Sequence, residues 1–190
     1  MTRDDNIRER SVYSLGAADG AIVGILMGIC TLCMVLTVRI QFLSIIGLLL
    51  LVVTPFVVWW MLCRSWIKGY CPPTFSAVWL HGICIYLFGS IIMALIFYLS
   101  MRYAVPNWIE IETREAAARL AEDPTTAYQA QVLINIIESG QLPSPIFTAV
   151  SSIWLVAFTG SLWSMGFAFI LTKMRFYRLK REQYAALIKQ

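Results

Sequence analysis

Four long apolar segments constrain this chain more than any other feature of its sequence. They lie at about 16–38, 42–63, 76–98 and 147–172, and each is long enough to cross a bilayer core, which takes about 20 helical residues. Hydrophobic residues make up 59% of the chain and charged residues 14%, against about a quarter charged in soluble proteins. The sequence therefore predicts an all-α integral membrane protein, a four-helix bundle that forms a single membrane domain over 1–190.

The distribution of lysine and arginine predicts how these helices are oriented. Basic residues concentrate on the cytoplasmic side of membrane proteins. The two termini and the connection between the second and third segments carry most of them, whereas the other connections hold only Arg39, Arg102, Arg114 and Arg119. We therefore expect both termini on the cytoplasmic side, with residues 173–190 as a basic cytoplasmic tail.

Small residues recur at every fourth position in the first segment, and in the fourth segment with one interruption at Val156. Residues four apart stay on one face of a helix, and a face without side chains lets a second helix approach closely in lipid. We therefore expect these faces to be helix-packing surfaces and to pack against each other. The ladder in the first segment and the stripe in the fourth consist of Gly16, Gly20, Gly24 and Gly28, and of Ser152, Gly160, Ser164 and Ala168.

The connection at about 104–145 is the one sizeable extramembrane segment. Its sequence predicts a helix over 108–121. It also predicts a second helix that starts at Asp123-Pro124, where Asp123 would be the N-cap and Pro124 the N1 residue. Gly140 is a natural stop for that second helix. Its apolar face is expected to comprise Tyr128, Val132, Leu133, Ile136 and Ile137. We predict an extracytoplasmic amphipathic hairpin, which is either a cap over the bundle or a docking surface for a partner.

Two ionisable residues fall within the apolar segments. Asp19 lies about one turn into the first segment and His81, the single histidine of the chain, about one turn into the third. Charged groups inside a membrane are costly, so each is a functional candidate. They could form a pair that moves a proton. Alternatively, Asp19 faces water near the headgroups and His81 forms a hydrogen bond between helices.

Aromatic and basic residues gather at the predicted cytoplasmic ends of the helices. An interfacial aromatic belt explains such a cluster by default, and a patch that binds a lipid headgroup or a sugar is the alternative. Basic residues there also favour contact with anionic lipid, and their position beside a membrane span argues against nucleic-acid binding. The candidate lipid or headgroup contacts are Trp59, Trp60, Arg64, Trp66, Lys68, Lys173 and Arg175.

No catalytic or metal-binding motif stands out in the sequence. Cys30 and Cys33 have the spacing of a redox or metal pair, but such motifs need a helix N-terminus, a loop or a second ligand pair. Within a membrane helix these cysteines are expected to be small packing residues. The chain also lacks a phosphate-binding glycine loop, HExxH and GxSxG. We expect no catalytic residue, no metal and no cofactor.

The order of features resembles a family of small bacterial inner-membrane proteins, common in the Bacteroidota, that is catalogued as a domain of unknown function, family 4199. The glycine-bearing first helix, the short turn after it and the stretch from Pro73 to Glu110 carry the resemblance. Positions typical of such a third helix and its exit are Phe75, Gly82, Gly89, Tyr98, Tyr103 and Pro106. The resemblance implies a four-helix protein of the bacterial cytoplasmic membrane with no established activity.

These features favour a non-catalytic integral membrane subunit or scaffold. Besides membrane lipid, its expected partner is another envelope protein or a second copy of the chain. One alternative is a small carrier or lipid-handling protein that uses Asp19 and His81. Another is a membrane-embedded transferase on a lipid-linked substrate, which would use Arg64 and the neighbouring aromatic residues.

Overall fold

The computed structural model describes residues 12–67 and 74–188, with the backbone alone at 66–67 and from 175 onward. Within these ranges the chain forms six α-helices, one π-helical turn and no strand. Four of the helices are long and apolar enough to cross a membrane, which confirms the predicted all-α fold with four membrane-length helices. The elements are α2 (Val12–Leu36), α3 (Leu43–Ile67), α4 (Phe75–Leu99), η1 (Ser100–Ala104), α5 (Trp108–Ala121), α6 (Ala127–Glu138) and α7 (Pro145–Ile188).

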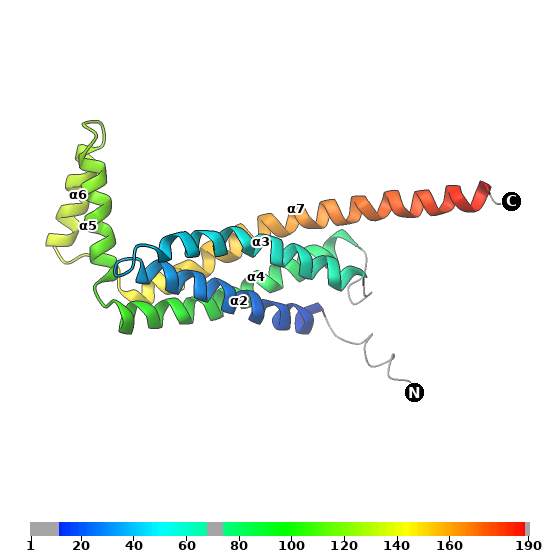
Figure 1. Ribbon diagram of the computed structural model, residues 1–190, viewed down its shortest axis with the longest axis horizontal. Coiled ribbons are helices and arrows are strands. Elements are labelled where there is room, and N and C mark those ends of the chain that lie inside the picture. Colours follow the sequence, from blue (N-terminus) through cyan, green and yellow to red (C-terminus); the bar gives the residue numbers. More distant parts are fainter. Residues whose placement is uncertain (1–11, 68–73, 189–190) are drawn as a thin grey trace.

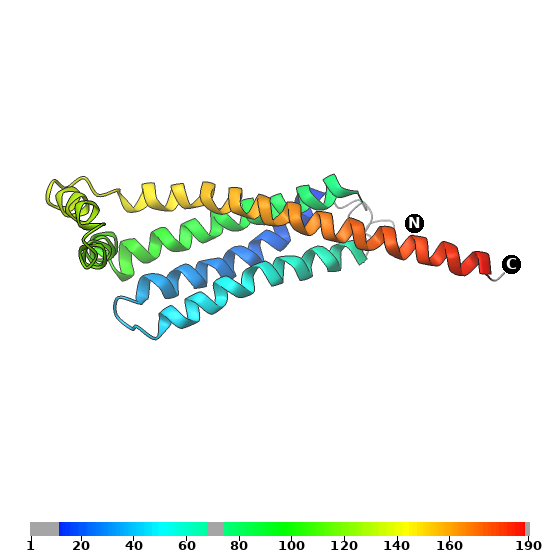
Figure 2. The same cartoon turned by 90° about the horizontal axis from the view of Figure 1, so that it is seen from above.

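The four long helices lie side by side, and α2 and α4 occupy the middle (Figure 2). The main contacts join α3 to α2, α2 to α4 and α4 to α7. Helices α5 and α6 project sideways from one end of the four, while the last part of α7 extends beyond the other (Figure 1). We name these the hairpin end and the tail end.

The two outer helices are the less buried ones. In their most apolar stretches α3 and α7 bury 28% and 17% of their residues, against 44% for α2 and α4. In a bilayer the exposed apolar residues of a spanning helix face lipid at no solvation cost. Helices α3 and α7 therefore expose most of their apolar residues, and α2 and α4 form the centre of the structure.

Local sequence explains where α4 begins and ends. Thr74 adopts an extended conformation and its hydroxyl accepts a hydrogen bond from the Ala77 amide, so it caps the first turn. At the other end the helix widens into η1, where the Val105 amide donates to the Ser100 carbonyl. The helix cannot continue because the residue before Pro106 is forced out of the helical region. The apolar span therefore reaches Ala104, beyond the predicted end near residue 98.

The predicted start of α6 is wrong. Asp123 does not cap a helix there, because its carboxylate accepts hydrogen bonds from the amide and hydroxyl of Thr125 and so closes a local turn. The Thr126 hydroxyl donates to the Leu120 carbonyl at the end of α5. This turn lies between the two helices, and α6 therefore begins only after it, at Ala127.

The predicted apolar face of α6 is also partly wrong. The buried side of the helix is built on Ala130 and Ile137, whereas Tyr128 is 81% exposed and Val132 38% exposed. Residues 130, 133, 134 and 137 share one face at helical spacing, and this face packs on α5, the main neighbour of α6. Gly140 ends the helix at a φ of 68°, where the Gln141 amide donates to the Ile136 carbonyl in a Schellman motif.

Candidate functional site

The glycine ladder of α2 packs against α4. A Cβ added at Gly24 would lie 2.7 Å from the Gly89 carbonyl oxygen, and one at Gly20 would lie 2.9 Å from the Ile85 carbonyl oxygen. Added atoms at Gly16 and Gly28 would collide with Cys84 and Ile96, also in α4. The two backbones therefore touch directly along this seam. The expected pairing of the ladder with the stripe of α7 is wrong, because α4 occupies the place beside it.

The small residues of α7 instead meet the other side of α4. Ser164 lies against Gly82, and Gly160 lies against the Tyr86 ring so closely that any side chain there would enter the ring. Ala168 and Ser164 are fully buried, and Ser152 is half-buried with its hydroxyl donating to its own helix. Helix α4 thus carries two glycines that each let a neighbouring helix approach, Gly82 for α7 and Gly89 for α2. The sequence analysis did not assign this packing role to Gly82 and Gly89, because two glycines seven residues apart are a weaker pattern than four glycines spaced four apart.

Asp19 and His81 meet between α2 and α4. His81 Nε2 lies 3.2 Å from Asp19 Oδ2, and the side chains are 1% and 20% exposed. His81 also lies beside Gly16, whose missing side chain makes room for the imidazole. The contact is a partly buried polar link between the two helices, near the tail end. Such links are costly to break from one side only, because the remaining partner stays buried.

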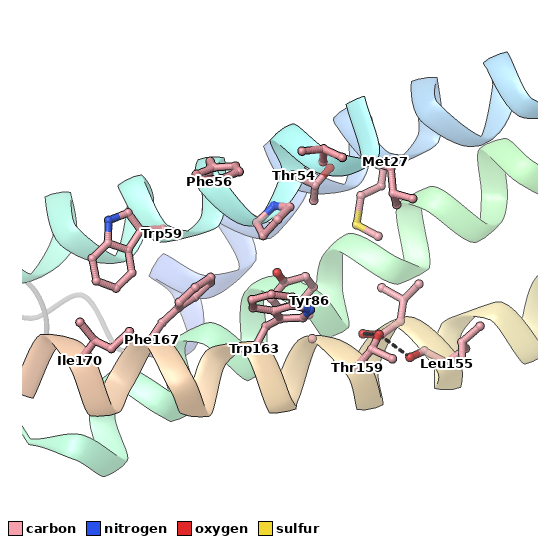
Figure 3. A pocket seen from close by; sticks show the side chains of 15 residues that line it. Met27, Thr54, Phe56, Trp59, Tyr86, Leu155, Thr159, Trp163, Phe167 and Ile170 are labelled. Carbon is pink, nitrogen blue, oxygen red and sulfur yellow. Dashed lines mark hydrogen bonds between the residues drawn. The ribbon is translucent and has the colours of Figure 1, made fainter. Parts of the chain in front are cut away.

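A cleft of about 890 Å³ lies between α3 and α7. Tyr86 of α4 and Met27 of α2 form its inner wall, and the aromatic side chains of Trp59, Trp163 and Phe167 line it from the two outer helices (Figure 3). Helices α3 and α7 are apart along most of the cleft and meet where Trp59 contacts Phe167 edge-on, with ring centroids 5.3 Å apart. The cleft therefore narrows toward the tail end.

The chemistry of the cleft is apolar. Its two threonines turn their hydroxyls onto their own helices, Thr54 to the Leu50 carbonyl and Thr159 to the Leu155 carbonyl, each at 2.8 Å. Among the residues that the structure describes, no aspartate, glutamate, histidine, lysine or arginine lines it. The Asp19–His81 contact lies outside its lining as well. Apart from the Tyr86 hydroxyl and the indole N–H groups of Trp59 and Trp163, the cleft presents carbon to a ligand, so it suits an alkyl group best.

Two of the predicted headgroup residues stand beyond the tail end of the cleft. Arg64 lies over the exposed Trp60 ring at 5.5 Å, and Lys173 lies over the exposed Phe169 ring at 5.9 Å. Among the described residues neither cation has an acidic partner, whereas Arg114 and Arg119 pair with glutamates. Trp59 lines the cleft. Lys68 and the side chains of Trp66 and Arg175 lie outside the described residues.

The hairpin formed by α5 and α6 has an acidic, partly apolar surface. Trp108 anchors α5 by packing edge-on against Phe97 at 5.6 Å. Partial burial, with a smaller effect of Glu115, raises the pKa of Glu112. The hydrogen bonds from Thr125 lower the pKa of the exposed Asp123. The described side chains of the hairpin form an acidic, partly apolar surface and no arrangement typical of a catalytic site.

The described parts of the chain bring no three histidine, cysteine, aspartate or glutamate side chains close enough to hold a metal. Cys30, Cys33, Cys63 and Cys84 are free thiols, and Cys30 donates to the Gly47 carbonyl where α2 meets α3.

The sequence analysis missed the cleft residues Tyr86, Trp163 and Phe167. No sequence signal could have found them, because the cleft exists only where α3 and α7 diverge.

The chain was compared with known proteins. No match was found among curated proteins or among solved structures. The family model described as "Protein of unknown function (DUF4199)" matches residues 19–173, from Asp19 through all four membrane-length helices. That match covers most of the chain, so the protein belongs to the DUF4199 family of unknown function.

Proposed function

We propose that the protein is a non-catalytic integral membrane subunit that holds another envelope protein through its α5–α6 hairpin. In this proposal the four long helices form a bundle in the bacterial cytoplasmic membrane with both termini in the cytoplasm. The hairpin then lies on the opposite side of the membrane. The excess of basic residues at the tail end supports this orientation.

The observation that carries the proposal is that α6 packs on α5 and leaves a second face free. Tyr128 and Val132 stand one turn apart on this face and are exposed. A helix that capped the bundle would bury such residues against the four long helices, and α6 makes its main contacts with α5 alone. A free face with an exposed tyrosine is typical of protein interfaces, in which aromatic residues are enriched.

The charge of the hairpin indicates the kind of partner. The segment 104–145 carries six carboxylates and two arginines, a net charge of −4 (2 − 6). Both arginines pair with glutamates of α5, at 3.0 and 3.3 Å. Repulsion disfavours both an anionic membrane surface and a second acidic hairpin. We therefore infer a partner protein with a basic surface. The carboxylates are Glu110, Glu112, Glu115, Glu122, Asp123 and Glu138.

Mild-detergent purification of the natively expressed protein, followed by mass measurement of the intact complex, tests the proposal. A stoichiometric partner should co-purify and should be lost when Tyr128 and Val132 are both replaced by serine. A photocrosslinking residue at position 128 should attach to that partner. The same residue at Ala118, exposed on α5, is the control and should not. A partner retained by the Tyr128/Val132 variant, or crosslinks to lipid alone, would contradict the proposal.

The contact between Asp19 and His81 favours a second candidate, a carrier or lipid-handling protein that uses this pair. Its support is the 3.2 Å contact of a carboxylate with a buried imidazole inside the membrane region. Asp19→Asn and His81→Gln test it in cells. If both variants fold and every phenotype of a deletion strain is restored, the pair has a structural role only.

A further inference from the structure

We propose that the cleft between α3 and α7 binds one acyl chain of an anionic phospholipid, whose phosphate lies between Arg64 and Lys173. This site lies on α3 and α7 and not on the hairpin, so it goes beyond the function proposed above. Its test does not depend on whether the hairpin binds a partner.

The size and length of the cleft fit one acyl chain. Its volume is about 890 Å³. A methylene group takes up about as much space as a water molecule in the liquid, about 30 Å³, so a chain of about 16 carbons needs roughly 500 Å³. Along α7 the lining runs from Leu155 to Ile170, which is about 22 Å at 1.5 Å per residue. The cleft is thus longer than one leaflet of a core about 30 Å thick.

The walls of the cleft favour an alkyl chain over a polar ligand. The hydroxyls of Thr54 and Thr159 are bound to carbonyls of their own helices, so these residues present their methyl groups. The rest of the lining is aliphatic and aromatic. A transmembrane helix of a partner is wider, about 10 Å with its side chains, and the Trp59–Phe167 contact closes the cleft to it at the tail end.

The two cations supply the headgroup contacts at the correct depth. Arg64 precedes Ser65, the last residue of its membrane span, and Lys173 precedes Met174, the last residue of the other. Helices α3 and α7 run in the same direction (Figure 1). Both cations, at the last turns of these spans, therefore lie at the tail end, where the Trp59–Phe167 contact narrows the cleft. Each lies over an exposed ring one turn back along its helix, a position between headgroups and hydrocarbon that aromatic rings prefer. Neither has an acidic partner among the described residues, so both can bind a phosphate.

Native mass spectrometry of the purified full-length protein tests the site with phosphatidylglycerol, and with phosphatidylcholine as the neutral lipid. We expect one tightly held phosphatidylglycerol and weaker phosphatidylcholine. Replacing both Arg64 and Lys173 by glutamine should weaken phosphatidylglycerol about thirtyfold, since each basic residue near a membrane surface contributes about a fivefold preference for anionic lipid. The matched control replaces Arg39 and Arg102, exposed cations at the hairpin end, and should change little.

A second pair of variants tests the cleft itself. Thr159 is exposed and lines the cleft, so Thr159→Trp should fill it and remove the bound lipid. Phe158→Trp, on the neighbouring lipid-facing position, should not. The proposal is wrong if Thr159→Trp keeps the lipid while the charge variant loses it, because binding would then need no cleft. Equal binding of both lipids, or a protein crosslinked to position 159 in place of lipid, would also overturn it.

Discussion

His81 Nε2 and Asp19 Oδ2 lie 3.2 Å apart and join α4 to α2 beside the first glycine of the seam. Among the described residues, no other ion-pair contact joins two of the membrane-length helices. A seam of glycines lets two backbones approach but leaves few side chains to prevent one helix from sliding along the other. We expect the polar contact at one end of the seam to help hold that register.

A double-mutant cycle on Asp19 and His81 should therefore reveal coupling. Asp19→Ala leaves the buried His81 imidazole without this partner and should lower the free energy of unfolding by about 1–3 kcal/mol, and His81→Ala should cost less because Asp19 is partly exposed. The double variant should cost less than the sum, with a coupling energy of about 0.5–3 kcal/mol. Unfolding in lipid–detergent micelles measures all four proteins. Strictly additive costs would show that the two side chains are independent.

Gly24→Ala should destabilise the protein, because the new methyl group would lie 2.7 Å from the Gly89 carbonyl oxygen. Backbone cannot move aside as a flexible side chain can, so we expect a cost of about 1–3 kcal/mol, and Gly24→Leu should prevent folding or assembly. Gly166→Ala is the matched control, since a Cβ there meets nothing within 4 Å. It should leave the melting temperature unchanged or slightly raised, because alanine favours the helix. Equal effects of the two alanine variants would refute the close seam.

Ser164→Ala and Ser90→Ala should differ although both serines are fully buried. The Ser164 hydroxyl has no hydrogen-bond partner within the described parts of the chain, whereas the Ser90 hydroxyl donates to the Leu87 carbonyl at 2.8 Å. Removing an unsatisfied buried hydroxyl should be neutral or stabilising. Removing a satisfied one should cost about 0.5–1.5 kcal/mol. Thermal unfolding of the two variants measures this difference. A larger drop in melting temperature for Ser164→Ala than for Ser90→Ala would show that the Ser164 hydroxyl has a partner.

Glu112→Gln should stabilise the hairpin at neutral pH. Partial burial raises the pKa of Glu112 above its unfolded value of about 4.3. Its favourable contribution is therefore complete below that value and is lost as pH rises through the folded pKa. At pH 7 the α5 amides of the variant should be more protected from hydrogen exchange than those of the wild type. At pH 4 this difference should be smaller. Glu138→Gln, at an exposed position on α6, is the control.

Asp123→Ala should have the opposite pH dependence. Hydrogen bonds from Thr125 lower the pKa of Asp123 below its unfolded value of about 3.9. Its contribution is present above that value and is lost as pH falls through the folded pKa. The variant should loosen the turn between α5 and α6 at neutral pH and match wild type in strong acid. The same exchange measurement follows this turn, and a difference that persists in acid would assign the loss to something other than the carboxylate.

The sequence by itself determined the spanning helices and most of the hairpin. The predicted spans match the four membrane-length helices to within a few residues at most ends. The reason is that a spanning helix must be apolar over the thickness of the bilayer core, so the length of an apolar run indicates the span. Helix α5 has the predicted bounds of Trp108 and Ala121, and Gly140 ends α6. These features depend on residues close in the sequence. The start of α6 was missed because hydrogen bonds of Thr125 and Thr126 compete with a cap at Asp123.

Only the tertiary structure decided which helices pack together. A glycine ladder indicates that some helix approaches closely, but α4 and α7 both carried small residues, and the ladder packs on α4. In lipid the buried and the exposed faces of a spanning helix are both apolar, so hydrophobic periodicity cannot identify the inner face. For the same reason the cleft between α3 and α7, and the approach of Tyr86, Trp163 and Phe167 within it, follow from how the helices diverge in space.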